Sequence, residues 1–166
     1  MKQFYFLLIA LMLSIFSYSQ TEGASKIYGY RQSIMPGTIR ADKDGNQVRP
    51  KPNYNYFIYL ASTSKVLPVE IWISGQAYSV TSTAVSTTPV EYKNPTSTEG
   101  HSKILVPKTS RRVLQLNSTG VPVQTPTKKG KALSANNELV IIYKANGKLY
   151  YKTLSKFSDL EALSMQ

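Results

Sequence analysis

The stretch that decides the fold is Glu138 to Leu154, ELVIIYKANGKLYYKTL. Two runs rich in Val, Ile and Tyr flank Asn146-Gly147, a dipeptide that favours a two-residue type I′ turn because both central residues take positive φ. The cross-strand pairs predicted from this turn are Ala145 with Lys148, Tyr143 with Tyr150, Ile142 with Tyr151 and Leu139 with Leu154. The face expected to be apolar carries Leu139, Ile141, Tyr143, Tyr150 and Leu154. An isolated hairpin is marginal in water, so this one needs more β-structure to lie on.

Working outward from the hairpin, further strands with turn signals between them recur along the chain. The predicted strands are 26–35, 38–41, 47–49, 53–62, 90–93, 103–106 and 111–116, with a hairpin over 69–80 that turns at Ser74-Gly75 and brings Trp72 near Ala77. Asn53 to Ser62 places Tyr54, Tyr56 and Ile58 on one face and Phe57 and Tyr59 on the other, which indicates a central strand. These strands predict an all-β fold, a small antiparallel β-sandwich that is either Ig-like or a partly open barrel.

Two segments near the C-terminus depart from this pattern. Val121 to Ala135 reads as a long loop, or as an edge strand in which Pro122 and Pro126 prevent pairing. Ser158-Asp159-Leu160-Glu161 matches a capping box, and Phe157 and Ala162 are spaced for a hydrophobic staple. The sequence therefore predicts a short helix at the C-terminus.

The N-terminus has the features of a signal peptide. Lys2 precedes an apolar run from Phe4 to Phe16, which is shorter than the roughly 20 residues of a membrane-spanning helix. Small residues then lead to an expected cut between Ser19 and Gln20. The predicted organisation is a signal peptide over 1–19, a flexible lead-in over 20–25 and a single β domain over 26–166, in which 81–137 is loop-rich and basic. We therefore expect a secreted or periplasmic protein, and the absence of cysteine fits a bacterial envelope better than a disulfide-rich extracellular module.

The chain is basic, with 20 Lys and Arg against 9 Asp and Glu. Such a charge favours polyanions, although it is also an ordinary way to keep a surface solvated. The candidate anion-binding residues are Lys103, Lys108, Arg111, Arg112, Lys128, Lys129 and Lys131. The aromatic residues Tyr54, Tyr56 and Tyr59 could offer stacking surfaces, although Tyr is also a good strand former.

Few residues suggest catalysis or metal binding. Glu70 and Glu91 are the acids in predicted strands, and a facing pair of carboxylates could hydrolyse a glycoside. Asp42, Asp44 and Asn46 have the spacing that begins a calcium loop, but the later ligands are missing and a tight turn explains them as well. His101 is the single histidine and is expected in a surface loop. The absence of cysteine excludes thiol catalysis and zinc sites built on cysteine.

These observations predict a non-catalytic cell-envelope accessory or binding module without a cofactor, with a protein or an envelope polymer as its partner. One alternative is a protein that binds polyanions, such as nucleic acid, lipopolysaccharide or acidic glycan. A second alternative, from another class, is a small glycan hydrolase that uses Glu70 and Glu91.

Overall fold

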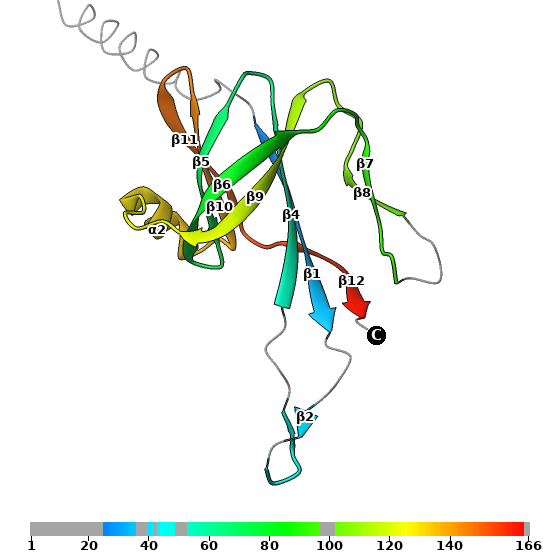
Figure 1. Ribbon diagram of the computed structural model, residues 1–166. Helices are drawn as coiled ribbons and strands as arrows, with labels where there is room; N and C mark the ends of the chain where they lie inside the picture. Colours follow the sequence, from blue (N-terminus) through cyan, green and yellow to red (C-terminus); the bar gives the residue numbers. More distant parts are fainter. Residues whose placement is uncertain (1–24, 36–39, 42, 49–52, 97–101, 165–166) are drawn as a thin grey trace, which may run out of the picture.

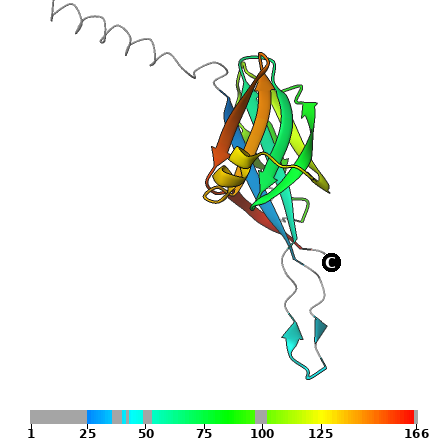
Figure 2. The same ribbon diagram turned by 90° about the vertical axis from the view of Figure 1, so that its left-hand side faces the viewer.

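The computed structural model describes residues 25–35, 40–41, 43–48, 53–96 and 102–164, so the predicted signal peptide lies outside the described residues. One eight-stranded sheet has the order β11-β10-β5-β6-β9-β4-β1-β12, with every neighbouring pair antiparallel except β1 and β12. These strands are β1 (Lys26–Met35), β4 (Asn53–Ser62), β5 (Leu67–Ile73), β6 (Gln76–Ala84), β9 (Arg112–Pro122), β10 (Leu139–Ala145), β11 (Lys148–Leu154) and β12 (Ser158–Ser164). Figures 1 and 2 show that the sheet curls into a half-barrel.

The hairpin predicted at Asn146-Gly147 is confirmed. Asn146 has φ 49° and Gly147 has φ 75°, the positive values that a type I′ turn requires. The observed pairs are Leu139 with Leu154, Ile142 with Tyr151, Tyr143 with Tyr150 and Ala145 with Lys148, as predicted. A second turn of the same kind, at Ser74-Gly75, joins β5 to β6 and pairs Trp72 with Ala77.

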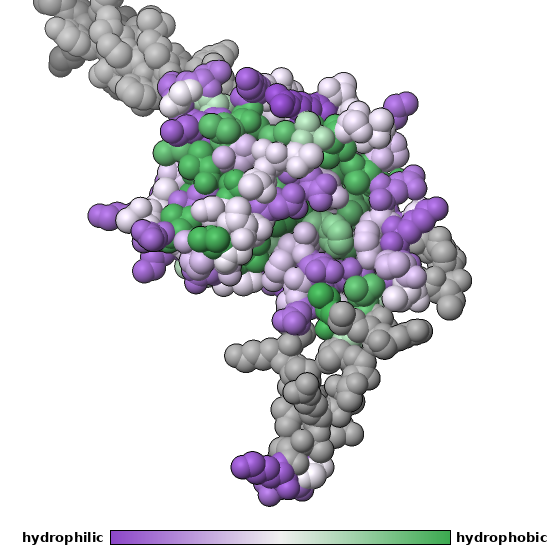
Figure 3. Space-filling model, viewed as in Figure 1, coloured by the Kyte–Doolittle hydropathy of each residue, from purple (hydrophilic) through white to green (hydrophobic). Residues whose placement is uncertain are grey.

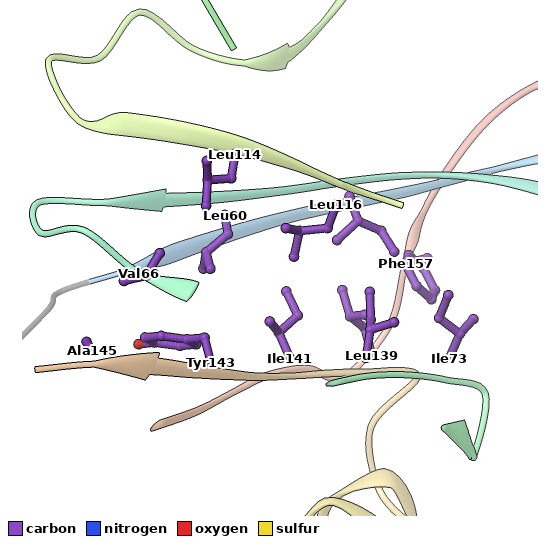
Figure 4. Packing of buried hydrophobic residues seen from close by; sticks show 12 residues of the cluster. Leu60, Val66, Ile73, Leu114, Leu116, Leu139, Ile141, Tyr143, Ala145 and Phe157 are labelled. Carbon is purple, nitrogen blue, oxygen red and sulfur yellow. The ribbon is translucent and has the colours of Figure 1, made fainter. Parts of the chain in front are cut away.

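The main core fills the concave side of the curled sheet. Figure 4 shows Leu60, Leu114 and Leu116 facing Leu139, Ile141 and Tyr143 across it. The all-β prediction is therefore confirmed, whereas the two-sheet sandwich is not. β6 pairs with both β5 and β9 and so joins the two facing halves into one continuous sheet, which is nearer to the partly open barrel that the sequence also allowed.

The start of β1, which precedes its pairing with β12, passes β11 at a seam. A Cβ on Gly29 would lie 2.6 Å from Cδ2 of Leu154 and 3.2 Å from the ring of Phe157, so a larger residue would have to displace the Leu154 side chain. At the start of β1, the hydroxyls of Ser25 and Tyr143 share a buried hydrogen bond of 2.7 Å. Side-chain packing therefore holds β1 against β11, although the two strands lie far apart in the sequence.

Two elements cover the convex side of the sheet. The helix α2 (Lys128–Ser134) lies over Trp72, Val140 and Ile142. A hairpin of β7 (Val90–Lys93) and β8 (Ser102–Val106) covers β4 and β9 on the other half, burying Leu105 and Val106. The predicted face of β4 is confirmed here, because Ile58 belongs to the main core and Tyr59 to this outer cluster.

Two predictions about the C-terminal third are wrong. Val121 to Ala135 is neither a long loop nor an edge strand, since β9 runs to Pro122 and α2 begins at Lys128. The predicted C-terminal helix is instead the strand β12, parallel to β1. Tertiary contacts override the capping box: Leu160 is buried in the outer cluster, and the side-chain amide of Gln32 donates to the carbonyl of Glu161. A separate hairpin of β2 (Arg40–Ala41) and β3 (Gln47–Val48) confirms the turn predicted between them.

Candidate functional site

A hollow of about 420 Å³ lies at one end of the half-barrel, where the main core reaches the surface. It is formed by the β5–β6 turn, the start of β4 and the far end of β9. Its lining residues are Tyr56, Ile73, Ser74, Gln76, Tyr78, Ser118 and Gly120. The mouth of a β-barrel is a common place for a ligand site, and the volume falls within the usual range of about 300–1,000 Å³. We call this hollow the barrel mouth.

Tyr56 lines the barrel mouth and packs against two further aromatic rings that do not line it. The ring of Tyr56 lies 5.0 Å from that of Phe157 and 6.2 Å from that of Tyr54, both tilted. Burial raises the pKa of Tyr56, although its hydrogen bond with Ser74 acts in the opposite direction. The phenol therefore stays protonated at neutral pH and offers both an apolar ring face and a hydroxyl.

A second hollow of about 360 Å³ adjoins the barrel mouth and shares Ser74 with it. The end of α2 and the chain that follows it make one wall. The other lining residues are Ser134, Ala135, Asn136, Asn137, Glu138 and Ser155. The backbone N–H of Ser74 donates to the carbonyl of Glu138 over 2.8 Å, which fixes the turn between the two hollows. Together the hollows form a surface rich in hydroxyls and amides.

The charges beside the mouth are paired with one another. Arg31 binds Glu138 at 3.1 Å and Asp159 at 2.6 Å, and its guanidinium lies 5.5 Å from the centre of the Tyr54 ring. The other carboxylate oxygen of Glu138 accepts the backbone N–H of Phe157 at 2.7 Å. The hydrogen bond from Arg31 lowers the pKa of Asp159, and the same bond raises the pKa of Arg31. The mouth itself is lined by uncharged residues.

The structure separates the two carboxylates considered for hydrolysis. Glu70 is buried on β5 beneath α2, where its carboxylate accepts hydrogen bonds from the indole of Trp72 and from the backbone N–H and hydroxyl of Thr127. Glu91 is exposed on β7, the hairpin that covers the opposite half of the sheet. Glu70 therefore anchors a helix, since Thr127 is the N-cap of α2 and accepts the N–H of Gly130.

The seven candidate anion-binding residues lie in two groups on different covers of the sheet. Lys103, Lys108, Arg111 and Arg112 belong to β8, the start of β9 and the segment between them, whereas Lys128, Lys129 and Lys131 belong to α2. Figure 1 shows α2 and the β7–β8 hairpin on opposite sides. Lys103 donates to the carbonyl of Asp159, and Lys129 lies 4.5 Å from the centre of the Tyr151 ring. The structure therefore does not bring the seven into one patch.

The remaining candidates do not form a site among the described residues. Asp44 and Asn46 are exposed in the β2–β3 turn, while Asp42 and His101 lie outside the described part. Within that part, His, Cys, Asp and Glu side chains form no group of three or more that could hold a metal ion. The described helix is too short to cross a bilayer.

Of the aromatic candidates found by sequence reasoning, Tyr56 lines the barrel mouth and Tyr54 lies beside it, and the rest of the lining was missed. Tyr59, the third aromatic candidate, is buried in the outer cluster and offers no open ring face. Ser74, Gln76 and Ser118 come from strands that only the sheet order brings together. In comparisons with known proteins, no family model matches the chain, and neither the curated proteins nor the solved structures contain a significant match.

Proposed function

We propose that this protein is an exported, non-catalytic binding module of the cell envelope whose ligand occupies the barrel mouth. The observation that carries the proposal is the lining: tyrosine rings, hydroxyls and amides without a charged side chain, in a chain of net charge +11. A site for a polyanion would be lined by Lys and Arg. An uncharged lining favours an uncharged ligand.

The chemistry of the lining favours a neutral polyhydroxylated ligand, such as a segment of an envelope glycan. A sugar presents an apolar C–H face and edges of hydroxyls that both donate and accept hydrogen bonds. Tyr56 and Tyr78 offer ring faces on which the C–H face of a sugar can stack. Ser74, Gln76 and Ser118 each carry a donor and an acceptor for the hydroxyls of the sugar.

The test is titration of the purified protein with neutral oligosaccharides of glucose and of N-acetylglucosamine, followed by amide chemical shifts. We expect shifts at Ser74, Gln76 and Ser118. Gln76→Ala and Tyr78→Ala should each weaken binding about tenfold, the loss of one good contact. Gln124→Ala and Tyr92→Ala, which are similarly exposed but lie elsewhere, are the matched controls. Shifts that are confined to other surfaces would contradict the proposal.

Export rests on the N-terminal segment. Mass spectrometry of the protein recovered from a bacterial host should show a chain that begins at Gln20. A chain that keeps Met1 and stays with the cytosolic fraction would contradict this part of the proposal.

The second candidate is binding of a polyanion through α2. The observation that favours it is a row of cations beside an aromatic ring, with Lys128 and Lys131 exposed and Lys129 over Tyr151. Retention on heparin and on a DNA duplex across a salt series tests it, because charge-driven binding weakens steeply with salt. Joint replacement of Lys128, Lys129 and Lys131 by Gln should abolish retention. The same replacement of Lys103, Lys108 and Arg112 should have a smaller effect.

A further inference from the structure

The convex face of the sheet is only partly covered by α2. The helix buries Trp72, Val140 and Ile142, but the next row across β5, β10 and β11 is open. In this row Lys144 pairs with Leu67 on one side and Leu149 on the other, so the three side chains share one face. Leu67 is 63% exposed, Leu149 44% and the neighbouring Val69 41%.

Lysines flank these exposed apolar residues. Lys65 lies two residues before Leu67, and both Lys65 and Lys144 are exposed. Segments 65–69 and 144–149 contain neither Asp nor Glu. In the view of Figure 3, hydrophobic side chains lie over β11 and β5, and the face of the sheet that α2 covers points to the left. We call Leu67, Lys144 and Leu149, with Lys65 beside them, the lysine–leucine surface.

We propose that the lysine–leucine surface docks on an anionic lipid bilayer. The tips of Leu67 and Leu149 would enter the boundary between head groups and acyl chains, while the lysine ammonium groups stay among the anionic head groups. The positive charge and the absence of carboxylates complement such a surface. The inference does not depend on the ligand of the barrel mouth, which uses other residues.

Two observations favour a bilayer over a protein partner. The core of a protein interface is depleted in lysine, whereas here Lys144 stands at the centre of the row. A stable protein interface also buries more than about 1,000 Å² in total, which is large for a surface with two exposed apolar side chains. A bilayer accepts a small surface of mixed apolar and cationic residues.

Docking would also orient the molecule. The lysine–leucine surface lies at the start of β5, and the barrel mouth lies beside Ile73 at its end. Because the docked residues lie on a face of the sheet, β5 would run along the bilayer, and a strand of seven residues would place the barrel mouth about 20 Å from them.

The test is co-sedimentation of the purified protein with vesicles of phosphatidylcholine, alone or mixed with phosphatidylglycerol. We expect binding to the mixed vesicles only, weaker at high salt. Leu67→Ser and Leu149→Ser should each reduce it about tenfold, and Lys144→Gln about fivefold. The matched controls are Val121→Ser and Ile104→Ser, which remove apolar side chains of similar exposure, 61% and 54%, from other surfaces.

Three outcomes would overturn the proposal. The first is an absence of binding to the mixed vesicles. The second is an equal loss of binding in the control variants, which would show non-specific adsorption. The third is self-association in sedimentation velocity that Leu149→Ser abolishes without any effect on vesicle binding, which would assign this surface to a protein interface.

Discussion

The indole nitrogen of Trp72 donates a hydrogen bond to the carboxylate of Glu70, two residues earlier on β5. Residues two apart on a strand share a face, so both side chains lie under α2. The same carboxylate accepts the N–H of Thr127 at 3.3 Å and its hydroxyl at 3.2 Å. A single buried carboxylate therefore fixes the start of α2, and the end of α2 forms a wall of the hollow beside the barrel mouth.

Glu70→Gln should lower the free energy of unfolding by about 1.5–3 kcal/mol. The donors of Trp72 and Thr127 surround the carboxylate, and the amide would place a further donor among them. Urea unfolding followed by the fluorescence of Trp72, the only tryptophan, measures the loss. Glu91→Gln, a change at an exposed glutamate, is the control. Equal stability of the two variants would show that the carboxylate does not anchor α2.

Gly130→Ala should destabilise the protein by about 1–3 kcal/mol, because overpacking outweighs the gain of about 1 kcal/mol in helix propensity. The new methyl would collide with Trp72, and would lie 2.6 Å from the hydroxyl of Thr127 and 2.9 Å from Cδ1 of Ile142. The emission of Trp72 should shift to the red as α2 moves away. Lys131→Ala on the same helix should leave stability and emission unchanged. A variant more stable than the parent would mean that the helix adjusts freely.

Gly29→Ala should cost about 1–3 kcal/mol of stability, since the methyl enters the space of Leu154 at the seam. The clash lies with the end of one side chain, so the double variant Gly29→Ala/Leu154→Ala should lose less than the two single variants together. Denaturant unfolding of the parent, the two single variants and the double variant measures the four stabilities of this double-mutant cycle. If the stability losses of the two single variants simply add up in the double variant, the strain does not lie between Gly29 and Leu154.

The carboxyl group of Asp159 should titrate below the usual value of about 3.9. The hydrogen bond from Arg31 lowers its pKa, so the stabilising contribution is present above the unfolded value and disappears as pH falls through the folded one. Carbon-detected NMR of the Asp side chains measures the midpoint. Arg31→Ala should raise it, and Arg112→Ala should not. An unchanged midpoint in Arg31→Ala would contradict the pairing.

The sequence predicted what local rules control. Asn146-Gly147 determined the register of β10 and β11, and Ser74-Gly75 placed Trp72 opposite Ala77. Local rules failed where long-range contacts decide. The capping box at Ser158 predicted a helix, but this segment pairs with β1 as a strand. The extended backbone allows Leu160 to pack in the outer cluster. The helix α2 was missed although Thr127 is a suitable N-cap, because Gly130 weakens the helical pattern and its role is to fit against Trp72.

The candidate site was less predictable than the fold. The aromatic run of β4 was visible in the sequence, but only burial separates Tyr56, which reaches the barrel mouth, from Tyr59, which does not. Ser118 joins Ser74 because β9 lies beside β6, and no local pattern specifies that neighbour. The charge of the sequence was misleading for the same reason, because it suggested one anion-binding region over 81–137. In the fold, the basic residues of this region lie on two separate covers of the sheet.

The parallel pairing of β1 with β12 joins the first strand of the sheet to the last. A nascent chain emerges from the ribosome N-terminus first, so one edge of β1 waits for a partner until the C-terminal residues are released. The hydrogen bond from Arg31 to Asp159 joins residues that are 128 positions apart in the sequence, and contacts at such a large sequence separation form slowly. Folding is therefore expected to be post-translational, and under the export proposed above the chain would remain competent for translocation until its synthesis is complete.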